Sequence, residues 1–475
     1  MPRPKRQRRG GLVSRLFEPV DAASLVVFRL AFGLLMLVEV WRFVHHGLVT
    51  SYYIEPSFHF TYWGFGWVRP WPGDGMYIHF GVLGLLAGLM AVGLFYRLSA
   101  VLFFLGFTYI FLLERANYLN HFYLICLVSF LMIFISPHRA FAVDAWRRPG
   151  WRSDTLPAWQ LWLMQFQIGI AYFFGGIAKL NADWLRCEPL RTWLARRTDF
   201  PLIGPYFTNE FVVHLFSYGG LLLDLLVVPA LLWRRTRLYA FGFAVFFHLM
   251  NARLFQIGIF PWFMLAATLL FFPPDWPRTL ARRLGFQRLG QLPAGSEIAV
   301  PFDWRRRLTI TCLAVYVAVQ VLLPLRHWLY PGDVSWTEEG HNFSWHMKLR
   351  SKEARVTFFV TDPKTPRTWE VRPAEHLSSR QLRKMSTRPD LILQFAHHLA
   401  DQYRARGYES VEVRAAVLCS LNGREPQLLI DPEANLAAQR EWIATAPWIL
   451  PLKEPLPDRV RIARDREGGW SESFD

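Results

Sequence analysis

The stretch SLVVFRLAFGLLMLVEVWRFV (residues 24–44) decides the class of fold. It holds 21 residues, of which only Arg29, Glu39 and Arg42 carry charge. About 20 mostly apolar residues in a helix are enough to cross the hydrocarbon core of a bilayer. The stretch therefore predicts a membrane-spanning helix.

Further apolar stretches follow along the chain. They lie at 77–95, 98–113, 118–136, 159–178, 211–233, 238–250, 257–272 and 309–325. Together with residues 24–44 they predict a polytopic α-helical membrane bundle of about nine spans. We assign this transmembrane helical domain to residues 1–328.

The composition of the chain agrees with a membrane protein. Hydrophobic residues make up 52% and charged residues 19%, yet the formal net charge is +16. Globular proteins carry about 25% charged residues. The basic residues punctuate the apolar stretches and do not cluster on a soluble module, so we exclude nucleic acid as a partner and expect membrane lipid. The four Cys lie far apart and show no disulfide or zinc spacing.

Basic residues near the ends of spans mark the cytoplasmic side of a membrane protein. If the spans alternate, one side receives residues 3–9, Arg97, Arg139, Arg147, Arg148, Arg152, Arg234, Arg235, Arg237, Arg282, Arg283 and residues 305–307. We therefore predict a cytoplasmic N-terminus, in the inner membrane of a bacterium or the endoplasmic reticulum of a eukaryote. An odd number of spans leaves everything after the last one on the non-cytoplasmic side.

The character of the sequence changes after Pro331. Residues 355–361, 368–371 and 411–420 alternate between apolar and polar as strands do, and residues 391–404 are typical of an amphipathic helix. We predict an α/β, β-rich soluble domain at 329–475 that is extracytoplasmic and packs on the outer membrane face.

Polar residues gather at the predicted outer ends of three spans. One group falls on each span, and the groups are Asn117, Asn120 and His121; Tyr172, Gly175, Gly176 and Lys179; and His248 and Asn251. Ionisable side chains in spans are costly and usually face a bundle interior or a cavity. We predict that Lys179, Asn120, His121 and His248 line one outward-facing cavity.

Each of these residues also has a simpler interpretation. Lys179 can extend its amine to the lipid headgroups, and Gly175 and Gly176 can permit close helix packing. Histidines in spans are more often hydrogen-bonded packing residues than catalytic ones. We interpret Asp224 as structural, paired with Arg29 or with a helix backbone. No metal site is predicted, because the histidines lack a carboxylate or thiolate at ligand spacing.

The cavity that these residues predict suits base chemistry. A lysine amine away from water favours its neutral form, which can take a proton from a phenol or a hydroquinone. We assign catalysis to Lys179, His121 and Asn120, and cofactor binding to Asn120, Gly175, Gly176, Tyr172 and His248. Aromatic residues of the outer loops can wall in a lipid-soluble cofactor, and they are Tyr52, Tyr53, Tyr62, Trp63, Trp67 and Trp71.

Four segments, in order, resemble the vitamin K-dependent γ-glutamyl carboxylase family in a bacterial form. They are YLNHFY (118–123), GIAKLNADW (176–184), FHLMNARLFQIG (247–258) and YPGDVSWTEEGHNFSW (330–345). The second has Ala178-Lys179 where the vertebrate enzyme has two lysines. The resemblance extends from Phe17 to Leu450, which is nearly the whole chain.

The resemblance implies a reaction and a role for each matched residue. Lys179 would deprotonate vitamin K hydroquinone, and the anion would react with O2 and rearrange to an alkoxide. That strong base would remove a γ-proton from a peptide glutamate, and the carbanion would capture CO2. Asn120 would hold the quinol oxygen, His121 would support carboxylation, and His248 matches a further family position.

Three functions remain open from the sequence. The first is this carboxylase, acting on a glutamate-containing peptide or protein. The second is a relative in the wider horizontally transferred transmembrane (HTTM) domain family that oxidises the quinol without carboxylating protein. The third is a non-enzymatic membrane transporter, against which Lys179, Asn120 and His121 argue. The vertebrate enzyme continues past the point that matches Asp475, into a β-rich region tied to propeptide recognition, and that function is not carried over.

Overall fold

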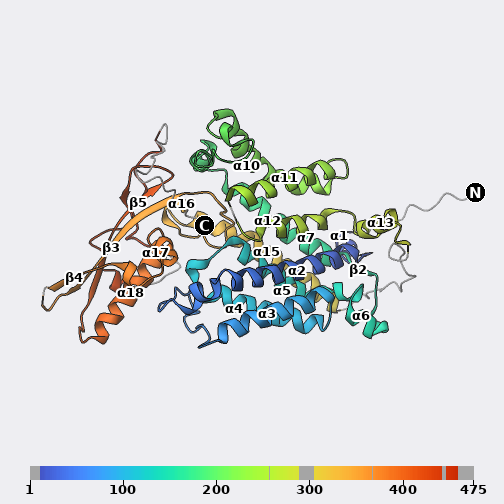
Figure 1. Cartoon of the computed structure of the whole chain (residues 1–475), viewed down its shortest axis with the longest axis horizontal. Coiled ribbons are helices and arrows are strands. Elements are labelled where there is room, and N and C mark those ends of the chain that lie inside the picture. Colours follow the sequence, from blue (N-terminus) through green and yellow to red (C-terminus); the bar gives the residue numbers. More distant parts are fainter. Residues whose placement is uncertain (1–10, 256, 288–303, 366, 441–444, 458–475) are drawn as a thin grey trace, which may run out of the picture.

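The computed structural model describes residues 11–255, 257–287, 304–365, 367–440 and 445–457. Figure 1 shows a bundle of long helices and, at one end of it, a domain built around a β-sheet. The predicted class of fold, a helical bundle followed by a sheet-containing domain, is therefore confirmed. The basic stretch at residues 3–9 lies outside the described residues.

Seven helices of the described chain are long and apolar enough to cross a membrane. They are α2 (Ala23–His45), α3 (Gly75–Val92), α4 (Tyr96–Leu113), α7 (Ala158–Ala178), α10 (Glu210–Leu232), α11 (Arg237–Phe255) and α15 (Trp304–Leu325). The two other predicted spans form shorter apolar helices, α5 (Asn120–Phe134) and α12 (Phe260–Thr268). About nine spans were predicted, three of them short; seven helices reach the length of a span and two are shorter, and each apolar stretch contains a helix.

Backbone geometry explains why α5 and α12 are short. Leu119 is extended (φ −134°, ψ 136°), so α5 begins only at Asn120. It ends at Phe134: Ile135 is extended again shortly before Pro137, because a proline disfavours helix in front of it. Gly258 has a φ of +58° just before α12, a conformation that favours glycine. Hydropathy alone does not register these turns.

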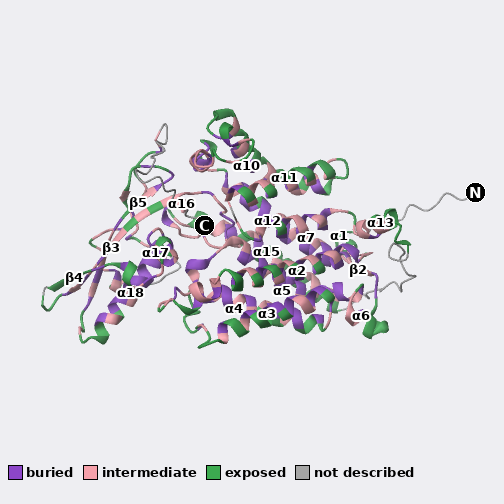
Figure 2. Ribbon diagram, viewed as in Figure 1, coloured by how far each residue is buried: buried purple, intermediate pink, exposed green. Residues whose placement is uncertain are grey.

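The interior of the bundle lies where α2, α3, α4, α5 and α7 meet, and Figure 2 shows buried residues there. In the most apolar 18-residue part of α7, 67% of the residues are buried inside the protein. In the corresponding part of α15, only 11% are buried. Large exposed apolar surfaces mark sites of contact with a membrane or a partner. In a bilayer, the exposed side chains of α15 therefore face lipid.

Arg29 of α2 is fully buried and is neutralised by backbone dipoles rather than by a carboxylate. Its guanidinium donates hydrogen bonds to the carbonyl oxygens of Pro137 at 2.9 Å and Phe141 at 2.7 Å. Such bonds let a cation lie inside a bundle. The predicted pairing of Arg29 with Asp224 is wrong, because each side chain has other partners.

The C-terminal domain is built on a four-stranded antiparallel sheet in the order β4-β3-β5-β6. The strands are β3 (Lys352–Asp362), β4 (Arg367–Val371), β5 (Glu412–Leu421) and β6 (Gln427–Leu428). The buried positions of β5 share one hydrophobic core with α18 (Pro389–Ala405), which follows α17 (Ser379–Met385). The predicted strands and the predicted amphipathic helix are confirmed.

Buried polar contacts attach this domain to the bundle. Asp183, in the short helix α8 (Ala182–Leu185), accepts hydrogen bonds from both Nη atoms of Arg424 at 2.6 and 2.7 Å. Arg380 of α17 donates from Nε to Asn117 Oδ1 at 2.6 Å. A two-pronged arginine–carboxylate contact also fixes orientation. These contacts hold the C-terminal domain against the end of the bundle that carries α8.

Elements that carry predicted cytoplasmic arginines lie at the other end of the bundle. Figure 1 places α6 (Val143–Arg147) and α13 (Trp276–Arg283) far from the sheet. This arrangement agrees with the alternation from which the orientation was predicted.

Candidate functional site

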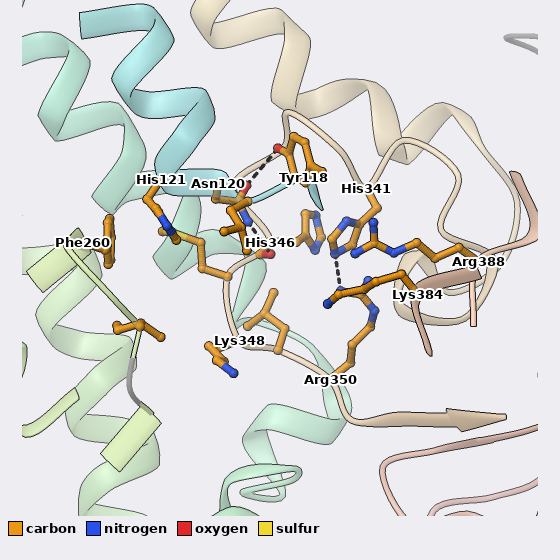
Figure 3. A pocket seen from close by; sticks show the side chains of 14 residues that line it. Tyr118, Asn120, His121, Phe260, His341, His346, Lys348, Arg350, Lys384 and Arg388 are labelled. Carbon is orange, nitrogen blue, oxygen red and sulfur yellow. Dashed lines mark hydrogen bonds between the residues drawn. The ribbon is translucent and has the colours of Figure 1, made fainter. Parts of the chain in front are cut away.

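A pocket of ≈ 100 Å³ lies where the bundle meets the C-terminal domain. The bundle contributes residues 118–121, Ile257 and Phe260, and the C-terminal region contributes His341, residues 346–350, Lys384 and Arg388. Figure 3 shows His121 and Phe260 on one side of this pocket and Arg388 on the other, with His341 and His346 between them. The site is therefore built jointly by the two parts of the chain.

Asn120 and His121 line the pocket from the first turn of α5. The Asn120 Nδ2 donates to the His346 carbonyl oxygen at 3.0 Å, and its Oδ1 accepts from the Tyr118 hydroxyl at 3.1 Å. An amide group carries two N–H donors, so one remains for a ligand. The His121 ring lies 5.7 Å from the Phe260 ring, measured between centroids.

Lys179 directly follows α7 and is buried. Its Nζ lies 2.6 Å from Asp224 Oδ2 and donates to the Gly175 carbonyl oxygen at 3.2 Å. The same Nζ lies 5.3 Å from the centre of the Trp184 ring. Lys179 therefore belongs to a buried ion pair, so the alternative interpretation as a lysine that reaches for lipid headgroups is wrong.

Asp224 of α10 is the partner of Lys179, although the sequence predicted a pairing with Arg29 or a helix backbone. Both side chains of the pair are buried, with relative exposures of 7% for Lys179 and 6% for Asp224. A buried ion pair is strongly destabilised when one partner is removed. The structure therefore corrects the interpretation of Asp224, which lies beside the predicted base and not beside Arg29.

Gly175 and Met347 connect the ion pair with the pocket. A Cβ added to Gly175 would lie 3.0 Å from the Cε of Met347 and 3.3 Å from Asp224 Oδ2. Met347 lines the pocket, whereas Lys179 does not. The predicted single cavity is therefore only partly present: Asn120 and His121 line it, and the lysine lies behind Met347.

Tyr172 and His248 form a second buried pair beside the same region. The Tyr172 hydroxyl and His248 Nε2 are 2.6 Å apart, while His248 Nδ1 has no hydrogen-bond partner among the described residues. The His248 ring lies 6.2 Å from the Phe260 ring, which lines the pocket. His248 therefore adjoins the pocket through Phe260 and does not line it.

Gly176 and the outer-loop aromatic residues have other surroundings. A Cβ on Gly176 would lie 2.6 Å from Leu225 Cδ2, so this glycine permits the close approach of α7 and α10. Tyr53 and Tyr62 are buried in the bundle core, and Trp63, Trp67 and Trp71 are exposed. These loop residues do not line the described pocket.

The cationic wall of the pocket is the part that sequence reasoning missed. Lys348, Arg350, Lys384 and Arg388 line it, and no carboxylate does among the described residues. Burial, together with neighbouring cations, lowers the pKa of His346 to about 3, so its imidazole is neutral near pH 7. The histidines fall in or beside the segment that resembled the carboxylase family, which was the available signal.

Comparison with protein families gives the class of membrane protein to which the chain belongs. The HTTM domain model matches residues 17–276, which is more than half of the chain, and it covers the helices that bear Asn120, Lys179 and His248. The model of the vitamin K-dependent gamma-carboxylase lumenal domain matches residues 305–455. The chain therefore belongs to the vitamin K-dependent gamma-glutamyl carboxylase family, as its motifs indicated. No solved structure matches the chain.

Proposed function

We propose that this chain is a membrane carboxylase that converts peptide glutamate to γ-carboxyglutamate with CO2. The reaction is coupled to the O2-dependent epoxidation of a vitamin K-type hydroquinone. One observation carries the proposal: the buried Lys179–Asp224 pair lies directly behind the pocket that Asn120 and His121 line. A base and a ligand-binding amide thus belong to one site.

The residues around the pocket suit a flat, weakly acidic aromatic ligand. Asn120 keeps one N–H donor for an oxygen atom, and His248 Nδ1 is a buried polar atom without a partner among the described residues. Buried polar atoms of this kind usually find a partner, so a ligand oxygen would satisfy them. Phe260 supplies an aromatic surface beside His121 and His248. Asn120 and Phe260 would therefore hold the hydroquinone, and His248 would support it from behind Phe260.

With the Met347 side chain moved aside, Lys179 Nζ would accept the proton of the ligand hydroxyl. When the proton of the ammonium passes along the 2.6 Å hydrogen bond to Asp224, both groups become neutral. The Asp224 carboxylate thus provides an acceptor for the ammonium proton within the buried site. The neutral amine is then free to take a proton from a weak acid.

The bound hydroquinone and O2 supply a base far stronger than any side chain, and the γ-carbon of glutamate requires such a base. The chain's own contribution is to place the acceptor amine and to exclude water. A strong base survives only where water is scarce. Both side chains of the Lys179–Asp224 pair are buried, which meets this condition.

Carboxylation of a defined peptide tests the proposal. The purified protein in lipid nanodiscs receives a vitamin K-type hydroquinone, O2, labelled bicarbonate and a glutamate-rich peptide. We expect label in the peptide and an equimolar amount of quinone epoxide. Epoxide without labelled peptide would favour the quinol-oxidising alternative, and neither product would contradict an enzyme of this kind.

A His121→Ala variant is expected to separate the two half-reactions. The family resemblance gives His121 a role after quinol oxidation, and the histidine is not part of the Lys179–Asp224 pair. We therefore expect epoxidation to continue while carboxylation falls by about 10² or more, the usual effect of losing a positioned acid–base group. The ratio of epoxide to γ-carboxyglutamate measures this. An equal loss of both products would contradict the assigned order.

We further propose that the C-terminal domain and the pocket lie on the non-cytoplasmic side. The support is the placement of the arginine-bearing elements α6 and α13 at the far end of the bundle. Cysteines introduced singly at exposed positions of β4 and α6 should react with a membrane-impermeant reagent from opposite sides of sealed vesicles. Labelling of both from the same side would contradict this orientation.

A further inference from the structure

Arg388 is a buried cation with one hydrogen-bond donor that the described residues leave unsatisfied. The side chain directly precedes α18 and has a relative exposure of 7%. Its Nη1 has no hydrogen-bond partner in the described chain, and the residue lines the pocket. A buried, unpaired charge is strongly unfavourable, so a cation that persists in such a place indicates a missing anion.

The neighbouring arginine is in a different state. Arg350 also lines the pocket, but Glu338 binds its guanidinium at 2.7 and 2.6 Å. Glu338 additionally binds Lys352 at 3.2 Å. The carboxylate of Glu338 is therefore already engaged, and the positive charge of Arg388 is left for a ligand.

Two histidines beside Arg388 also leave polar atoms unused. Arg350 Nη1 lies within hydrogen-bond distance of His341 Nε2, and because an arginine only donates, Nε2 must accept. Burial holds the pKa of His341 well below its usual value, so the neutral ring carries its proton on Nδ1. That Nδ1, which lies 3.8 Å from Glu338 Oε2, and Nε2 of His346 have no hydrogen-bond partner among the described residues.

We infer that Arg388 binds the side-chain carboxylate of the substrate glutamate, with His341 and His346 completing the wall around it. The inference rests on the proposed function, and it assigns the specificity for an acidic side chain to one residue. Figure 3 shows the Arg388 side chain directed toward His341 within the pocket. The carboxylate would lie between Arg388 and the wall formed by residues 346–350.

The chemistry of the reaction explains why a cation belongs there. The C–H bond at the γ-carbon breaks, the proton goes to the base that quinol oxidation supplies, and the electron pair remains on the carbon. That carbon adjoins a carboxylate, so the negative charge spreads over two oxygens that are already anionic. The pair then forms the C–C bond to CO2. A fixed guanidinium stabilises charge that develops in this way.

Peptide binding in the absence of quinol tests the inference without relying on turnover. The full-length protein in nanodiscs is titrated with a glutamate-rich peptide and with the same peptide carrying glutamine at every glutamate position. Loss of a hydrogen bond to a charged group weakens binding by about 10- to 100-fold. We expect wild type to prefer the glutamate peptide by such a factor, Arg388→Gln to lose this preference, and Arg388→Lys to keep part of it.

Arg383→Gln is the matched control, because Arg383 is exposed on α17 and does not line the pocket. It should bind both peptides as wild type does. Thermal unfolding separates a binding role from a structural one: Arg388→Gln should be at least as stable as wild type, since it removes an uncompensated buried charge.

The outcomes are distinguishable. Wild type without preference for glutamate would contradict the proposed substrate and the inference together. Wild-type preference that survives in Arg388→Gln would overturn only the assignment of Arg388. The assignment of Arg388 would also fail if Arg388→Gln lost much of its thermal stability while Arg388→Lys kept the wild-type preference for glutamate. The side chain would then be structural.

Discussion

Lys179→Ala is expected to abolish both quinol epoxidation and glutamate carboxylation. The Nζ of Lys179 is the acceptor that starts the sequence, and loss of a positioned base costs about 10² to 10⁴ in rate. Epoxide and γ-carboxyglutamate are measured in the same reaction, and both should fall by the same factor. A lysine that only stabilised the helix end would leave most of both activities in the folded fraction.

The stability of this variant needs its own control. Lys179→Ala leaves the Asp224 carboxylate buried without its partner, which destabilises by about 3–5 kcal/mol. The double substitution Lys179→Met with Asp224→Asn removes both charges and keeps the volume. We expect it to unfold near the wild-type temperature and to remain inactive. Substantial activity in this double variant would show that the ion pair is structural.

Asp224→Asn is expected to lower quinol epoxidation by about 10² or more, because an amide cannot receive the proton of the Lys179 ammonium. Asp224→Glu keeps the carboxylate and should retain part of the activity. The effect should fall on kcat, since Asp224 contacts Lys179 and does not line the pocket.

The pH dependence separates this positioning role from a purely structural one. Without the carboxylate, the ammonium of Lys179 loses the group that accepts its proton, so the pH profile of epoxidation by Asp224→Asn should differ from that of wild type. The rate is measured across pH at saturating quinol. A uniform loss at every pH, with an unchanged profile, would assign Asp224 to packing alone.

The fold class and the residues of the site could be predicted from the sequence to different degrees. Apolar stretches near 20 residues place helices in a membrane because the bilayer fixes their length. The same rule does not give the length of each helix, since it does not detect the extended Leu119 or the turn at Gly258. Alternation of apolar residues was enough to find β3 and β5.

The partner of the predicted base could not be found from the sequence. Lys179 directly follows the long helix α7 and Asp224 lies on α10, so their contact depends on how these helices pack. The close packing at Gly176 and Leu225 sets that arrangement. Arg29 was a reasonable alternative partner by type, but its position places it among backbone carbonyls at the other end of the bundle.

The contribution of the C-terminal domain to the site could not be predicted from the sequence pattern either. The carbonyl of His346 binds Asn120, and Met347 reaches Gly175, so this segment joins two groups that lie far apart in the chain. Such contacts follow from docking of one domain on the other, through Asp183 with Arg424 and Asn117 with Arg380. Periodicity describes each element but not the docking.

Rescue of Lys179→Ala by small amines is the most direct test that the amine at this position is the base. Epoxidation by the folded variant is measured with alkylamines of similar size but different basicity, and with alcohols of matched shape. We expect the rate to rise with amine concentration and with amine basicity, while the alcohols have no effect, because only a neutral amine can replace the lost proton acceptor. No rescue by any amine in the folded variant, or equal rescue by the alcohols, would contradict the role of Lys179 as the base.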